Sequence, residues 1–276
     1  MRKGRRDLIM IYKRITFSDT AYLDCYLHET YQWDIVGKVN KCHPAILICP
    51  GGGFNDISCS EAEPVALTFL GQGFSCFVLT YTTGDACSWN TATTEMMWAI
   101  KTVRDNAKEW NINPDALAVM GFSAGGTMGA IAATQWKNTE EGEYLRPNAC
   151  VLAYGDYDLA PIVREDTPTP EELGMPRTEG KPEYYIVNAI DKNTPPCFIW
   201  HTRRDTAVPT WHSIDFAYRL DDFDIDYEFH LWDFCDHGMT VFNRNTDSDN
   251  YDSRTHRNVG KWVEMCSLWL MNRFGY

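Results

Sequence analysis

A serine lies between glycines in the stretch VMGFSAGGTMGAIAA, which runs from Val119 to Ala133. Gly121 and Gly125 flank Ser123 at two residues on either side, which gives the pattern Gly-x-Ser-x-Gly. The apolar run ALAVMGF before the serine is typical of a buried strand, and the small residues after it are typical of a helix. A strained strand-to-helix turn that exposes a serine hydroxyl is the arrangement of a nucleophile elbow. The stretch therefore predicts that Ser123 is a nucleophile rather than a solvated serine in a glycine turn.

Two later segments offer an acid and a base for this serine. Asp205 follows the predicted strand CFIWHT, and a carboxylate there can accept a hydrogen bond from an imidazole N–H and fix its tautomer. His237 follows the predicted strand IDYEFHLW and precedes a glycine, whereas His230 lies within that strand and His256 lies on a polar loop. The order Ser123, Asp205, His237 along the chain is the order expected of an α/β-hydrolase triad.

A glycine-rich loop, CPGGGF from Cys49 to Phe54, follows the predicted strand AILI. Its backbone N–H groups can approach a substrate oxygen closely and stabilise a developing oxyanion. The helix that begins after Ser123 adds the positive end of its dipole. A phosphate-binding loop is the rival interpretation, but no Gly-Lys-Ser/Thr follows the glycines.

Strands and helices alternate along the rest of the chain, which predicts a mostly parallel sheet with helices on both faces. Two early alternating segments, YKRITF and AYLDCYLH, predict an antiparallel hairpin at the sheet edge. We expect a helix over TTEMMWAIKTVRDNAKEW with Thr93 or Thr94 as its cap, and a turn at INPD. No linker divides the chain, so we expect one domain over residues 1–276. The polar, proline-rich segment 156–196 is interpreted as a lid or insert over the site, and 243–258 as a surface loop.

The composition excludes several classes of protein. A formal net charge of −13 repels polyanions, so we expect no nucleic-acid partner, and the basic N-terminal MRKGRR is interpreted as a solvated tail. Neither a secretory signal nor a membrane-spanning run is visible. The ten cysteines are scattered and contain no Cys-x-x-Cys pair, so we expect free thiols and a cytoplasmic location. No cluster has metal-ligand spacing, and we expect neither a metal nor a cofactor.

The sequence resembles the α/β-hydrolase superfamily, and within it the compact bacterial acetyl esterases and acyl-sugar or xylan esterases. The resemblance rests on ILICPGGGF, EAEPVALTFLGQGFSCFVLTY, MGFSAGG, FIWHTRRDTAVP and DHG. Pro50 stands where many relatives have histidine before the glycine triplet, and Thr127 stands where relatives often have histidine. The resemblance implies the following site: nucleophile Ser123, acid Asp205, base His237, and an oxyanion hole formed by the N–H groups of Gly52, Gly53 and Ala124.

These observations favour a serine carboxylesterase that hydrolyses short acyl esters of small molecules through an acyl-enzyme. The preference for acetyl esters of sugars or xylan fragments comes from the resemblance alone. A serine exopeptidase of the same fold is the alternative, although such enzymes commonly have a propeller or large cap for which this chain has no room. A third possibility is a binding protein of the same fold that has no catalytic activity, but the presence of all three triad residues argues against it. The sequence predicts no oligomeric state.

Overall fold

The computed structural model describes residues 10–28, 42–242, 246 and 258–276 of the chain. One eight-stranded sheet runs through it in the order β1-β2-β4-β3-β5-β6-β7-β8. The first two strands pair antiparallel at one edge, as the early alternating segments predict, and β3 to β8 are parallel to one another. The strands are β1 (Ile11–Thr16), β2 (Tyr22–Leu27), β3 (His43–Cys49), β4 (Ser75–Thr80), β5 (Ile112–Phe122), β6 (Ala149–Ala153), β7 (Cys197–Thr202) and β8 (Tyr227–Trp232).

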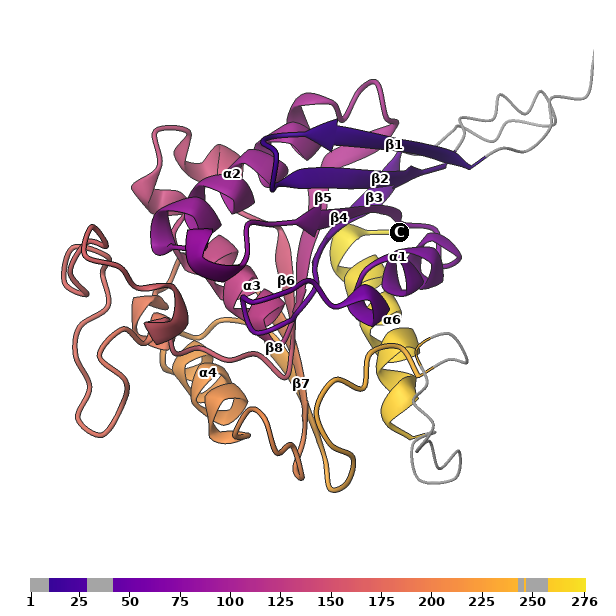
Figure 1. Cartoon of the computed structure of the whole chain (residues 1–276). Coiled ribbons are helices and arrows are strands. Elements are labelled where there is room, and N and C mark those ends of the chain that lie inside the picture. The colour runs from indigo at the N-terminus through magenta and orange to yellow at the C-terminus, as the bar shows by residue number, and fades with distance from the viewer. Residues whose placement is uncertain (1–9, 29–41, 243–245, 247–257) are drawn as a thin grey trace, which may run out of the picture.

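Helices cover both faces of this sheet (Figure 1). α1 (Glu63–Leu70) and α6 (Trp262–Phe274) lie on one face, and α2 (Trp89–Asp105), α3 (Ala124–Thr134) and α4 (Trp211–Asp222) lie on the other. A buried apolar cluster fills the space between the sheet and each helical layer. The predicted α/β-hydrolase architecture is therefore confirmed.

The central strands consist of apolar residues because both of their faces are covered. All five residues of β6, ACVLA, are buried, as are the last seven of β5. β8 at the open edge instead has exposed or half-buried positions throughout. This contrast is the one expected between the inner and outer strands of a parallel sheet.

Two local predictions are wrong: the bounds of the helix, which ends at Asp105 rather than Trp110, and the turn at INPD. α2 begins at Trp89 and not near Thr93, because Ser88 forms a capping box with Thr91, with N–H to hydroxyl distances of 3.2 and 2.9 Å. The INPD sequence is part of β5 and not a turn. Its pairing with β3 shifts register between His43 and Ala45, and this irregularity accommodates a proline that cannot donate to the ladder.

The segment 156–196 is polar in sequence, but its apolar residues pack into the core. It consists of short turns, with an isolated bridge between Asp158 and Tyr185. Leu159, Ile162 and Met175 are fully buried within the cluster beneath α2, α3 and α4. The segment therefore packs as part of the layer that contains α2, α3 and α4.

Some predictions concern residues that the structure does not describe. The basic N-terminal residues, His256 and most of 243–258 lie outside the described residues. All ten cysteines are described, and all are free, as expected. Within the described ranges, no helix is both long and apolar enough to cross a bilayer.

Candidate active site

Ser123 occupies a sharp turn between β5 and α3, with φ of 54° and ψ of −121°. Such a backbone conformation is costly for a residue with a side chain. A Cβ on Gly121 would lie 1.9 Å from the Gly125 carbonyl oxygen, and one on Gly125 would lie 1.9 Å from the Cys49 carbonyl oxygen. The two glycines of the Gly-x-Ser-x-Gly pattern are thus required by close packing at the turn.

The structure brings Ser123, His237 and Asp205 together beyond the carboxyl ends of β5, β8 and β7. The Ser123 hydroxyl donates to Nε2 of His237 at 2.8 Å. Nδ1 of the same ring donates to Oδ2 of Asp205 at 2.7 Å. The order hydroxyl, imidazole, carboxylate is the one in which a serine can lose its proton to a base that a carboxylate orients.

Asp205 is held by donors on both oxygens, and its side chain is fully buried. Oδ1 accepts from the backbone N–H groups of Ala207 and Val208 at 2.9 and 2.7 Å. Burial raises the pKa of Asp205, but hydrogen bonds from His201, His237 and Val208 outweigh it and hold the pKa well below its usual value. Asp205 is therefore ionised throughout the neutral range.

His201 is a second imidazole on Asp205, which sequence analysis treated only as a strand residue. It is fully buried, and its Nε2 lies 3.1 Å from both Asp205 Oδ2 and the Val208 carbonyl. Its Nδ1 lies 2.8 Å from the Ser213 hydroxyl. Because two acceptors face Nε2, we assign the proton to that nitrogen, and Ser213 then donates to Nδ1. The sequence feature that could have indicated this role is a histidine within an apolar run, four residues before Asp205.

The loop that carries His237 is fastened at both ends. Before the histidine, the Asp236 carbonyl accepts from the Thr202 hydroxyl at 3.0 Å. After it, the Thr240 carbonyl accepts from the indole N–H of Trp262 in α6 at 2.7 Å. Cys235 and Thr240 have positive φ values of 79° and 42°, so the loop holds a conformation that these contacts must stabilise.

The glycine-rich loop packs directly against the serine turn. A Cβ on Gly51 would lie 2.8 Å from both the Phe122 carbonyl oxygen and Ser123 Cβ. Gly52 and Gly53 follow with positive φ of 126° and 62°. The N–H groups of Gly52, Gly53 and Ala124 make no hydrogen bond to another described residue. Ala124 adjoins Ser123, and Gly52 and Gly53 follow the glycine that contacts it, so these three N–H groups are candidates to bind an oxygen on a substrate.

Glu61 is a buried carboxylate that links the glycine-rich loop to the histidine loop, and the sequence did not indicate this role. Its Oε2 accepts from the Gly51 N–H at 2.8 Å, and its Oε1 accepts from the Tyr154 hydroxyl at 2.7 Å. The Tyr154 oxygen in turn accepts from the Thr240 N–H at 3.2 Å. The Tyr154 ring contacts the His237 ring edge-on, with centroids 4.9 Å apart. One carboxylate thereby positions groups on both sides of Ser123.

We expect Glu61→Gln to lower kcat by about tenfold, because an amide cannot accept from both donors and a buried bond to a charged group contributes about 1.5–3 kcal/mol. The rate of nitrophenyl acetate hydrolysis measures this loss. Glu63→Gln is the matched control, since Glu63 is exposed two residues away. Full activity in Glu61→Gln at an unchanged melting temperature would refute the positioning role.

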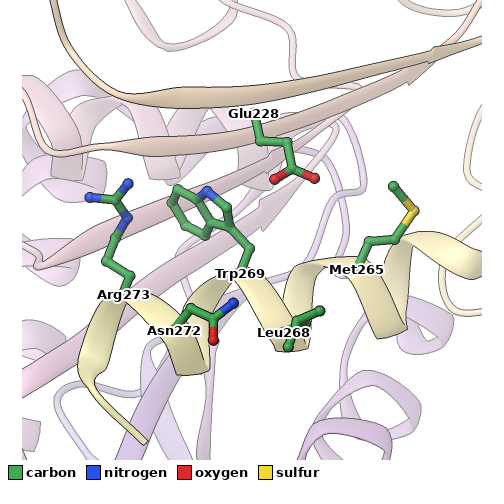
Figure 2. A pocket seen from close by; sticks show the side chains of 6 residues that line it. All are labelled: Glu228, Met265, Leu268, Trp269, Asn272 and Arg273. Carbon is green, nitrogen blue, oxygen red and sulfur yellow. The ribbon is translucent and has the colours of Figure 1, made fainter.

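A hollow of about 490 Å³ lies between α6 and β8, away from Ser123. Figure 2 shows Glu228 of β8 pointing toward Trp269 and Met265 of α6. Glu228 is near the amino end of its strand, whereas the triad lies past the carboxyl ends, so this hollow is separate from the serine site. Among the described residues, no group of three or more histidines, cysteines or carboxylates is placed to hold a metal ion.

The chain is similar to several known proteins. The chain matches the BD-FAE family over residues 34–220. It is 32% identical to endo-1,4-beta-xylanase B of Butyrivibrio fibrisolvens over 72% of this chain and 33% of that protein. It is 30% identical to the acetylxylan esterase of Xylanibacter ruminicola over 68% of this chain and 37% of that protein. The chain thus spans about a third of the length of these curated relatives.

A solved structure is similar over nearly its whole length. MGS-M1, an alpha/beta hydrolase enzyme from a Medee basin deep-sea metagenome library, is 30% identical to this chain, with a TM-score of 0.78. The match covers 97% of this chain and 99% of MGS-M1. From the family match and the fold together, the chain belongs to the BD-FAE family and is an α/β-hydrolase.

Proposed function

We propose that this protein is a serine carboxylesterase that hydrolyses short-chain, acetyl-type esters, among them esters of sugars or xylan fragments. The observation that supports this most directly is the pair of hydrogen bonds, 2.8 and 2.7 Å, that join Ser123 to His237 and His237 to Asp205. The strained turn beneath Ser123 and the free N–H groups beside it are the other parts that acyl transfer requires. We further propose that residues 1–276 act as a single catalytic domain.

In the first half of the reaction, Nε2 of His237 accepts the Ser123 proton while the serine oxygen attacks the ester carbonyl carbon. The carbonyl oxygen becomes an oxyanion, which the N–H groups of Gly52, Gly53 and Ala124 stabilise. Asp205 stabilises the imidazolium that forms and does not take a proton itself. When the tetrahedral intermediate collapses, Nε2 donates its proton to the departing alcohol and an acyl-serine remains.

In the second half, water takes the place of the alcohol. Nε2 of His237 accepts a proton from the water as it attacks the acyl-serine, and the same three N–H groups stabilise the second oxyanion. Collapse returns the proton to the Ser123 oxygen and releases the carboxylic acid. Apart from the ester and the water that it consumes, the proposed cycle uses only groups of the chain.

The substrate class rests on the relatives. One similar protein is an acetylxylan esterase and another is a xylanase. Acetate release from acetylated xylo-oligosaccharides, measured beside nitrophenyl acetate and an aminoacyl-nitroanilide, tests the proposal. Hydrolysis of the esters but not the anilide supports a carboxylesterase, whereas cleavage of the anilide alone would indicate an exopeptidase.

We expect kcat/KM to fall steeply between butyrate and octanoate esters. The apolar residues of 156–196, such as Leu159, Ile162 and Met175, are buried in the core and are not available to line a channel for a fatty chain. In an apolar groove, four extra methylenes would add about 3 kcal/mol of binding. A nitrophenyl ester series measures the trend, and a higher kcat/KM for octanoate would contradict it.

A further inference from the structure

Asp156 is a carboxylate at the serine site that the reaction above does not use. It follows β6, and its backbone N–H donates to the Ser123 carbonyl at 3.4 Å. Its own carbonyl accepts from the Thr127 hydroxyl in α3. These two contacts fix the Asp156 backbone against the residue that carries the nucleophile.

The Asp156 carboxylate is partly exposed to solvent. Its side chain is 39% exposed. Oδ1 accepts from the Asp158 N–H at 3.1 Å, and no described residue donates to Oδ2. Burial raises the pKa of Asp156, while the Asp158 N–H and the protonated form of His237 act in the opposite direction. The group is thus half-buried on a backbone that contacts Ser123 directly.

The Asp156 charge has no fixed countercharge among the described residues. The nearest basic group is His212, whose Nδ1 lies 3.6 Å from Oδ1. That nitrogen accepts from the Tyr157 N–H at 3.1 Å, so it has no proton to give to Asp156. Burial lowers the pKa of His212 to about 4, and the ring is neutral at working pH. No lysine or arginine in the described ranges forms an ion pair with Asp156.

We propose that Asp156 is a specificity-determining residue that selects neutral esters and rejects substrates with a negative charge near the scissile bond. This rests on the proposed esterase function. Like charges in partly buried surroundings repel strongly, because water and salt screen them less there. By this chemistry, an acetyl ester of a neutral sugar is a substrate, and an ester of a uronic acid or a dicarboxylic acid is a poor one.

Two pairs of substrates that differ mainly in charge test this selection. The acyl pair is nitrophenyl butyrate and mono-nitrophenyl succinate, whose four-carbon acyl chains differ in a terminal carboxylate. The alcohol pair is the acetyl esters of a neutral and an acidic xylo-oligosaccharide. The measured quantity is the ratio of kcat/KM for the neutral substrate to that for the anionic one, since a ratio cancels any general effect of a substitution on the triad.

We expect a neutral-to-anionic ratio of roughly tenfold or more in the unaltered protein for at least one pair, and Asp156→Asn should reduce it several-fold. Asparagine keeps the shape and the acceptor for the Asp158 N–H, so the loop is retained. Asp166→Asn removes the same charge from an exposed position and should leave the ratio unchanged. A ratio near one in the unaltered protein, or an equal change in both variants, would overturn the proposal. Failure of the esterase function is distinct, because then neither neutral ester is hydrolysed.

Discussion

Replacing Ser123 by alanine should lower kcat for nitrophenyl acetate by about 10⁴-fold or more, because only binding and oxyanion contacts would then remain. Among the described residues, the only side-chain partner of the hydroxyl is His237, whose ring is 21% exposed and can bond to water instead. The fold should therefore persist. Steady-state kinetics on purified protein, with circular dichroism as the check on folding, measure both effects.

A companion variant separates the chemistry from the strain at this position. Ser123→Gly should be equally inactive but more stable to heat than Ser123→Ala, since φ of 54° with ψ of −121° costs a residue with a side chain about 1–3 kcal/mol. Activity comparable to that of the unaltered protein in Ser123→Ala, free of contaminating esterase, would remove Ser123 from the mechanism.

The second large effect is expected at Asp205. Asp205→Asn should lower kcat by about 10⁴-fold, because the wrong histidine tautomer is stabilised. The N–H groups of Ala207 and Val208 require an oxygen at Oδ1, so the amide NH₂ must occupy the place of Oδ2. There it donates to Nδ1 of His237, which forces the ring proton onto Nε2, and Nε2 can then no longer accept the Ser123 proton.

The same amide also faces His201, whose Nε2 proton would lose one of its two acceptors. We therefore expect a lower melting temperature in addition to the kinetic loss. Asp233→Asn, at an exposed position just after β8, is the control and should change neither quantity. A loss of less than tenfold in a folded Asp205→Asn protein would mean that another group orients His237.

The sheet and the proximity of Ser123, Asp205 and His237 could be predicted because each depends on a local signal in the sequence. Ser123, Asp205 and His237 each follow a predicted strand, and the ends of parallel strands meet at one edge of a sheet. Apolar runs and alternating segments, bounded by turn residues, were sufficient to identify these strands. The start of α2 was missed because the Ser88 cap competes with equally plausible threonines further along.

The positioning groups could not be predicted because they depend on contacts between distant residues. Glu61 and Tyr154 are 93 residues apart in the chain, and no spacing or pattern in the sequence links them. The segment 156–196 was interpreted as a lid or insert over the site from its charge and proline content. Its apolar residues determine its position, because burying them in the cluster beneath α2, α3 and α4 is favourable while its charged side chains can remain in water.

The strand order has a consequence for how the protein matures. β5, β6, β7 and β8 are neighbours in the sheet in the same order in which they are synthesised. Ser123 follows the first of these four strands and His237 the last, and the histidine loop is then held by Trp262 in the helix that follows. Domains generally fold as units. The hydrogen bond between Ser123 and His237 can therefore be held in place only after the chain has been synthesised as far as Trp262, long after Ser123 itself has been made.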